Sequence, residues 1–121
     1  MGRYLRAMLA QGAFGGVRLF SPAAVEAMTR DQTGAMAEIP EAMRLQASWG
    51  LGWRRVVGWQ WSSYLGDLLS PGSYGHGGAT GTAVWNDPSR DLACVLFTTE
   101  PSANSGTLLG RCSNLVAAAA L

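Results

Sequence analysis

The spacing of apolar residues is helical in the first third of the chain and strand-like after it. Residues 3–11 carry apolar side chains at helical spacing and are followed by Gly12, which predicts a short helix that stops there. Ser21-Pro22 predicts the start of a second helix, at about 22–30, because the serine hydroxyl can accept from an unpaired backbone N–H and proline suits the first helical position. The mixed stretch that follows leaves room for one turn of helix at 41–46.

From Trp49 onwards the side chains alternate with a period of two, which predicts strands. We expect strands at 49–58, at 74–85 with glycine interruptions, and at 92–99. Residues 86–90 (Asn-Asp-Pro-Ser-Arg) are typical of a turn between the second and third strands. The third strand is apolar enough to be a central strand that is buried on both faces.

A final helix is expected at 105–120, so the predicted order is two helices, three strands and one helix. This order predicts an α+β fold in which a three-stranded antiparallel meander packs with the C-terminal helix and the two N-terminal helices. At 121 residues the chain has room for a single domain. We expect it to be mainly helical over 1–48, with strands and the terminal helix over 49–121.

Composition describes a globular chain without a strong overall charge. Hydrophobic residues make up 48% and charged residues 14%, and nine arginines against eight carboxylates give a net charge of +1 without any lysine. We therefore expect no nucleic-acid partner and no electrostatic attraction to an anionic membrane. No apolar run is long enough to span a membrane, and the N-terminus lacks the pattern of a signal peptide. The sequence therefore does not indicate in which cellular compartment the protein is found.

Metal and cofactor sites are not expected. The chain has one histidine and two cysteines, Cys94 and Cys112, which are best interpreted as buried or half-buried thiols. The glycine-rich stretch 74–82 has four glycines in seven positions, which weakens a strand unless something must approach its backbone closely. It does not match a phosphate loop, because no lysine follows, nor a dinucleotide fingerprint, because Thr80 replaces the third glycine. A bulged strand with a histidine remains the simplest structural alternative.

Several ordered stretches resemble the C-terminal half of the β-lactamase-related serine hydrolases, which include class C β-lactamases, DD-peptidases and related esterases. These stretches are 49–53 (WGLGW), 75–81 (GHGGATG) and 86–96 (NDPSRDLACVL), preceded by 4–9, 15–22 and 25–28. The resemblance covers essentially the whole chain in the family's order. It implies a partial β-lactamase/transpeptidase-like fold, a single partial domain formed by the C-terminal portion of such an enzyme.

The resemblance also implies where substrate would bind. His76, Gly77 and Gly78 occupy the positions of the family's third active-site motif, Lys-Thr-Gly or a histidine variant. An imidazole can donate a hydrogen bond to a carbonyl or carboxylate, and small residues allow substrate close to the strand. The backbone N–H of Ala79 matches the position of an oxyanion donor. The implied substrate is a small acyl compound (an ester, amide or β-lactam), and the histidine variant is closer to esterases and peptidases than to β-lactamases.

The nucleophile of the family is absent from this chain. Without lysine there is no Ser-x-x-Lys motif, and none of the three tyrosines begins Tyr-x-Asn. A Gly-x-Ser-x-Gly elbow is also missing. Ser73 and His76 are three residues apart and would point to opposite faces of a strand, so they are a poor nucleophile–base pair. No catalytic residue is identified, and we expect no turnover by the chain alone. The alternatives are one half of a split enzyme, complemented by an N-terminal half, and a non-catalytic ligand-binding module.

The remaining conspicuous residues have structural interpretations. Trp49, Trp53 and Trp85 are expected to pack in or beside the sheet, and Trp59 and Trp61 to lie near the rim of the substrate cleft. The adjacent pair Arg54-Arg55 is expected to be a solvated edge. Because the family's N-terminal strands and helices are missing, we also expect an exposed apolar edge and hence marginal stability or self-association.

Overall fold

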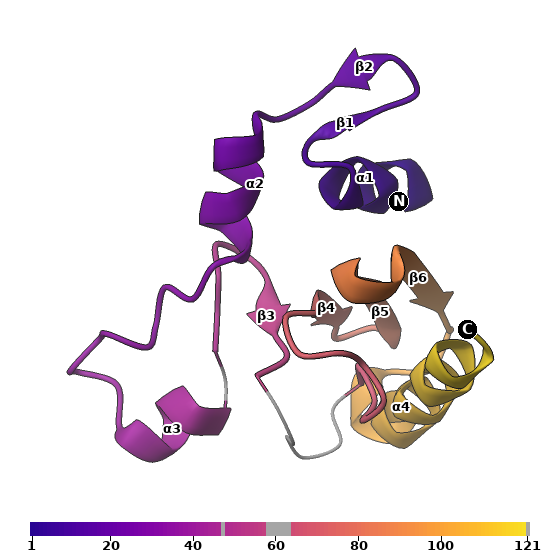
Figure 1. The fold of residues 1–121 in the computed structure, drawn as a ribbon. Helices are drawn as coiled ribbons and strands as arrows, with labels where there is room; N and C mark the ends of the chain where they lie inside the picture. Colours follow the sequence, from indigo (N-terminus) through magenta and orange to yellow (C-terminus); the bar gives the residue numbers. More distant parts are fainter. Residues whose placement is uncertain (47, 58–63, 121) are drawn as a thin grey trace.

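The computed structural model describes residues 1–46, 48–57 and 64–120. Figure 1 shows short helices and a small hairpin in the first part of the chain, then an antiparallel sheet and a long C-terminal helix. In chain order the elements are α1 (Gly2–Leu9), β1 (Ala13–Phe14), β2 (Val17–Arg18), α2 (Pro22–Thr29), α3 (Glu41–Gln46), β3 (Arg54–Arg55), β4 (Tyr74–Gly78), β5 (Thr82–Asp87), the 3-10 helix η1 (Pro88–Arg90), β6 (Leu92–Phe97) and α4 (Ser102–Ala119).

The predicted helices are present, and α2 begins for the expected reason. Ser21 caps α2 by accepting a hydrogen bond from the Ala24 backbone N–H at 3.1 Å. The chain leaves α1 through Gly12, whose φ of +93° suits glycine, as the stop signal predicted. The helix expected at 41–46 is α3. None of the helices within the described ranges is long and apolar enough to cross a membrane.

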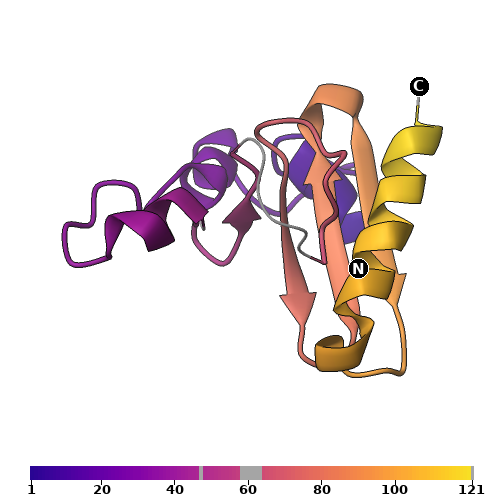
Figure 2. The same cartoon turned by 90° about the horizontal axis from the view of Figure 1, so that it is seen from below.

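Within the described residues the main sheet has the order β3-β4-β5-β6, with every neighbouring pair antiparallel. The antiparallel meander and the α+β class are therefore confirmed. Helices α1 and α4 pack on opposite faces of this sheet (Figure 2). Register fixes which residues share a face: His76 lies beside Val84, which in turn lies beside Val95.

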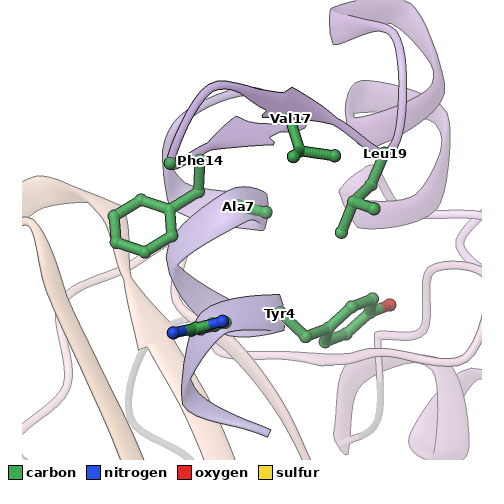
Figure 3. A pocket seen from close by; sticks show the side chains of 7 residues that line it. Tyr4, Ala7, Phe14, Val17 and Leu19 are labelled. Carbon is green, nitrogen blue, oxygen red and sulfur yellow. The ribbon is translucent and has the colours of Figure 1, made fainter.

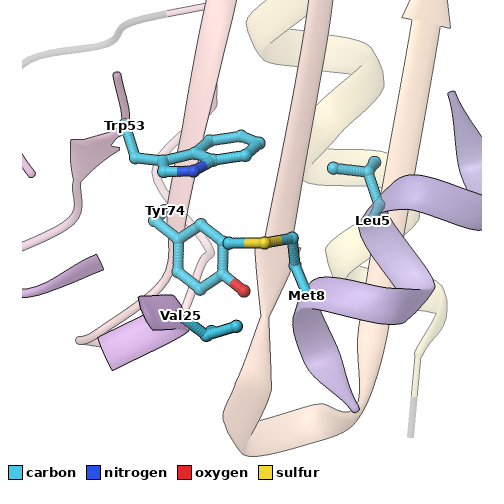
Figure 4. Packing of buried hydrophobic residues seen from close by; sticks show 5 residues of the cluster. All are labelled: Leu5, Met8, Val25, Trp53 and Tyr74. Carbon is cyan, nitrogen blue, oxygen red and sulfur yellow. The ribbon is translucent and has the colours of Figure 1, made fainter. Parts of the chain in front are cut away.

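Each face of the sheet has its own apolar cluster. On the face covered by α1 and α2, the cluster consists of Leu5, Met8, Val25, Trp53 and Tyr74. In Figure 4 the Met8 side chain points from α1 towards the Tyr74 ring. On the α4 face, the cluster consists of Leu65, Leu69, Trp85, Cys94 and Ala117. The sheet is therefore covered by apolar side chains on both of its faces.

The predicted strand at 49–58 is wrong. Trp49 pairs with Arg54 in an isolated antiparallel bridge, and the Gly50 N–H donates to the Trp53 carbonyl at 2.8 Å, so the chain reverses direction here. Gly52 has φ +79°, which a residue with a side chain rarely adopts. The alternation of aromatic and glycine residues thus belongs to a tight turn, and only Arg54–Arg55 extends as β3.

The predicted strand at 74–85 is two strands. A turn at residues 79–81 separates β4 from β5, and the Gly81 N–H donates to the Gly78 carbonyl at 3.0 Å. Gly81 has φ +83°, and a side chain there would collide with the Glu100 backbone carbonyl. The turn expected at 86–90 is confirmed as η1, where the Asp87 carboxylate accepts from the Ser89 N–H at 3.1 Å.

The third predicted strand is present as β6 but not in the predicted place. It is the last strand in the order of the sheet, and no strand lies on its outer side among the residues that the structure describes. The expectation that it is central is therefore wrong for this chain, although α1 and α4 cover its two faces. An apolar strand sequence indicates that both faces of the strand are covered. It does not indicate how many neighbouring strands pair with the edges of that strand.

Candidate functional site

Strand β4 is glycine-rich, and within the described residues its outer edge is paired over only part of its length. Strand β3 pairs with Tyr74 and Gly75, and β4 continues beyond it through His76, Gly77 and Gly78. Among the described residues, no strand pairs with this second part of the edge. A free strand edge offers backbone donors and acceptors to an extended partner, so this stretch can bind a peptide-like group.

The His76 side chain is exposed and has a defined hydrogen bond. Its Nδ1 lies 2.7 Å from the Gly77 carbonyl oxygen. Because a carbonyl can only accept, Nδ1 carries the proton, and in the neutral ring Nε2 keeps a lone pair. The Trp49 ring packs against the imidazole with 5.6 Å between centroids and 61° between planes. The arrangement gives an oriented imidazole whose Nε2 can accept a proton or hydrogen bond.

Glycine is required at position 77 by a neighbour on the other face of β4. A Cβ at Gly77 would lie 2.9 Å from three carbons of the Tyr64 ring. The Arg54 guanidinium lies over the same ring, 5.9 Å from its centroid. At Gly75 a Cβ would lie 2.7 Å from Leu65 and Trp85 atoms. These glycines therefore let aromatic and apolar side chains lie directly against the strand backbone.

The residues predicted for the substrate site are contiguous in space. His76, Gly77 and Gly78 form the end of β4, and Ala79 is the first residue of the turn that follows and is exposed. Gly78 pairs with Thr82 across this turn. Ala79 therefore lies at the end of the strand edge that His76 occupies.

The buried serines have structural roles or lie away from the histidine. Ser73 is fully buried whereas His76 is exposed, so the two do not form a nucleophile–base pair. Ser113 accepts from the Trp85 indole N–H at 3.0 Å and donates to the Tyr64 carbonyl at 3.2 Å. Ser48 accepts from Arg55 at 3.2 Å. Within the described ranges, no cluster of His, Cys, Asp or Glu could hold a metal ion.

Sequence reasoning missed three neighbours of the site: Trp49, Arg54 and Tyr64. Trp49 is half-buried beside the histidine, while Trp53 and Trp85 are buried in the core as expected. The interpretation of Arg54-Arg55 as a solvated edge is wrong, because both are half-buried, Arg54 on Tyr64 and Arg55 on Ser48. The expectations for Trp59 and Trp61 fall outside the described residues.

Comparisons with known proteins place the chain in a family. A family described as Beta-lactamase matches residues 1–111. A protein of Escherichia coli O157:H7 named as a D-alanyl-D-alanine carboxypeptidase is 33% identical over 97 residues, which is 80% of this chain and 20% of that protein. A protein with the same name in Salmonella paratyphi B is 35% identical over 101 residues, 84% of this chain and 21% of its own length. The chain spans about a fifth of the length of these curated relatives.

Solved structures show the same fold. A β-lactamase from Mycobacterium bovis superimposes with a TM-score of 0.72 at 23% identity, over 95% of this chain and 41% of the other. A penicillin-binding protein homologue from Caulobacter crescentus has a TM-score of 0.60 at 24% identity, over 81% of this chain and 24% of the other. The resemblance noted in the sequence and the partial fold it implied are confirmed. This chain belongs to the β-lactamase family, and it corresponds to part of the length of its relatives.

Proposed function

We propose that this chain supplies the substrate-facing strand of an acyl-transfer serine hydrolase and that it needs a complementing part for turnover. The carrying observation is the edge of β4 at His76–Gly78, with which no strand pairs in the part of the chain that the structure describes, and which carries an exposed, oriented imidazole. Its acyl substrate is an ester, an amide or a β-lactam. The names of the curated relatives favour an amide of the D-alanyl-D-alanine type.

In the complete enzyme each residue of this edge has a separate role. The substrate backbone lies along Gly77 and Gly78, where no side chain intervenes. The Ala79 N–H is the oxyanion donor, and it stabilises negative charge that develops on the attacked carbonyl. His76 hydrogen-bonds to the substrate or to the nucleophile through Nε2. The nucleophilic serine and its activating base come from the complementing part, because this chain has no lysine and no Ser-x-x-Lys.

The outer edge of β6 supports the need for a complementing part. The strand is six residues long, apolar, and covered on both faces, which is the environment of a strand inside a sheet. Such an edge is prone to pair with any available strand. The complementing N-terminal half adds a strand there and, with it, the helix that carries the serine.

Two assays test the proposal. The chain alone is incubated with a chromogenic short-chain ester, a chromogenic cephalosporin and a fluorophosphonate probe, and we expect neither turnover nor labelling. A separately produced N-terminal part that carries Ser-x-x-Lys is then added, and we expect labelled serine and ester or peptide hydrolysis. In this mixture His76→Ala abolishes turnover, while Thr99→Ala, an exposed change outside the site, leaves it unchanged. Labelling of a serine in the chain alone would contradict the proposal.

A non-catalytic binding module is the second candidate, and the aromatic rings beside β4 favour it. Trp49 and Tyr64 lie on opposite faces of the strand at His76 and Gly77, and aromatic rings are common walls of ligand sites. If the complemented mixture stays inactive but the chain binds an acyl-D-alanyl-D-alanine peptide, this second function holds. A His76→Ala variant then loses affinity for the peptide.

A further inference from the structure

A pocket lies between α1 and the β1–β2 hairpin and shares no residue with the His76 site. Its volume is about 400 Å³, within the range of small-molecule sites. Figure 3 shows Val17 and Leu19 above the helix, the Tyr4 ring below Leu19, and Phe14 on the other side of Ala7. Phe14, Val17 and Leu19 are 41%, 58% and 52% exposed, which is high for large apolar side chains that face a hollow.

The polar side chains at this pocket can all donate hydrogen bonds, and some of them are cationic. Arg3 and the Tyr4 phenol line it, and the Arg6 guanidinium lies over the Phe14 ring, 5.3 Å from its centroid. Burial raises the pKa of Tyr4 above its ordinary value of 10.0, so the phenol keeps its proton at neutral pH. None of the lining residues carries a carboxylate. A ligand that fits must therefore offer an acceptor or a negative charge beside an apolar body.

Charge along the chain is unevenly distributed, although the net charge is only +1. The first 25 residues contain three of the nine arginines and none of the eight carboxylates. The ion pair between Arg90 and Asp87, at 3.7 Å, lies in another part of the structure. Arg18 donates to the Gln11 and Phe20 carbonyls and so holds the hairpin rather than a carboxylate. The positive field at the pocket is thus available to an anion from solution.

We propose that this pocket binds a single-chain organic carboxylate, with its hydrocarbon against Ala7, Val17 and Leu19 and its carboxylate at Arg3 and the Tyr4 hydroxyl. The hollow is bounded by a helix and a hairpin, so it takes one narrow chain and does not present the flat face that a bilayer needs. An arginine–carboxylate hydrogen bond is stronger than a neutral one and gives the site its preference for the anion.

The test is calorimetric titration of the whole 121-residue chain with decanoate, below the concentration at which decanoate self-associates. We expect saturable 1:1 binding, at least tenfold tighter than that of decyltrimethylammonium, which has the same tail and the opposite charge. Val17→Asp puts a negative charge on the pocket wall and is expected to weaken binding at least tenfold. Val57→Asp is the matched control, since Val57 is 43% exposed and does not line the pocket, and it leaves binding unchanged.

Arg3→Gln provides a second variant at an exposed helix position, and it is expected to weaken decanoate several-fold while leaving binding of decanol unaffected. Absence of saturable binding, or equal binding of the cation, would overturn the proposal. An equal loss in Val17→Asp and Val57→Asp would do the same. Binding to phosphatidylglycerol vesicles without binding of free decanoate would identify a membrane surface as the occupant and would also overturn it.

Discussion

The side-chain amide of Asn86 donates to the backbone carbonyl of Leu5 at 3.1 Å, across 81 positions of sequence. The same nitrogen lies 3.1 Å from the Tyr74 hydroxyl, so one buried amide joins α1, β4 and β5. Asn86 is fully buried, and its hydrogen bonds are made without competition from water.

Replacing Asn86 with alanine is expected to lower the free energy of unfolding by about 1–3 kcal/mol, because buried partners lose their donor. Tyr74→Phe removes only one of the two contacts and should cost less. Urea unfolding followed by tryptophan fluorescence measures both. If Asn86→Ala costs no more than Tyr74→Phe, the link between α1 and the sheet contributes little to stability.

Leu5 and Leu115 form a matched pair for measuring the core on the α1 side. Leu5 is fully buried, whereas Leu115 is 71% exposed, and both are in helices. Leu5→Ala is expected to cost about 2–5 kcal/mol through lost burial and a cavity, and Leu115→Ala under about 0.5 kcal/mol. Thermal unfolding by circular dichroism distinguishes them. Equal effects would mean that α1 does not pack on the sheet as described.

Gly77→Ala is expected to destabilise the chain by about 1–3 kcal/mol, since the new methyl group meets the Tyr64 ring. Tyr64→Ala in the same chain removes the obstacle, so the double variant should lose less than the sum of the two single variants. A double-mutant cycle on denaturant unfolding gives this coupling. Strict additivity would show that Tyr64 is not against β4.

Stability is expected to fall in alkaline solution. Burial raises the pKa of Tyr74 above 10.0 and that of Cys94 above 9.0, whereas the unfolded chain keeps the ordinary values. Below the unfolded pKa both states hold the proton, and as pH rises the unfolded state releases it first, so stability is lost. Unfolding free energies between pH 7 and 11 should show this decline, and Cys94→Ala combined with Tyr74→Phe should make it shallower, with the remaining part due to Tyr4, whose pKa is also raised by burial. An unchanged slope in the double variant would contradict the attribution of the decline to Cys94 and Tyr74.

Self-association of the chain alone is expected through the outer edge of β6, with which no described residue pairs as a strand and where Phe97 is 69% exposed. Phe97→Lys should reduce it, because a charged side chain at an edge opposes strand pairing. Leu115→Lys, an equally exposed change on α4, should not. Sedimentation velocity over a range of concentrations measures the difference. A monomeric wild-type chain at high concentration would remove the basis for this prediction.

The sequence predicts helix starts better than strand ends in this chain, for a physical reason. The Ser21 cap depends on atoms three residues apart, so local sequence specifies it. Turns at Gly52 and Gly81 interrupt runs that alternate as strands do. A glycine has no side chain to show which face of a strand it occupies. A period-two pattern therefore continues across a turn in which the chain reverses direction, and the sequence does not show the turn. For this reason the sequence predicts a strand at 49–58, where the structure has a tight turn before β3, and one strand at 74–85, where it has β4 and β5.

The candidate site likewise has a part that the sequence predicts and a part that it does not. The motif at His76–Gly78 can be located from the sequence because its residues are adjacent. Its neighbours Tyr64 and Trp49 come from other segments, and no spacing in the sequence relates them to the strand. The only local sign was the glycine at position 77, which indicates that something lies close without saying what.

The packing of α1 against β5 and β6 has a consequence for synthesis on the ribosome. Helix α1 has eight residues, fewer than an isolated helix needs to persist in water. The strands that cover it, β5 and β6, are translated after it. The apolar side of α1 therefore stays uncovered until these strands have emerged, and we expect a nascent chain halted before Leu92 to be bound by chaperones. Translation through β6 lets α1 fold against strands made after it.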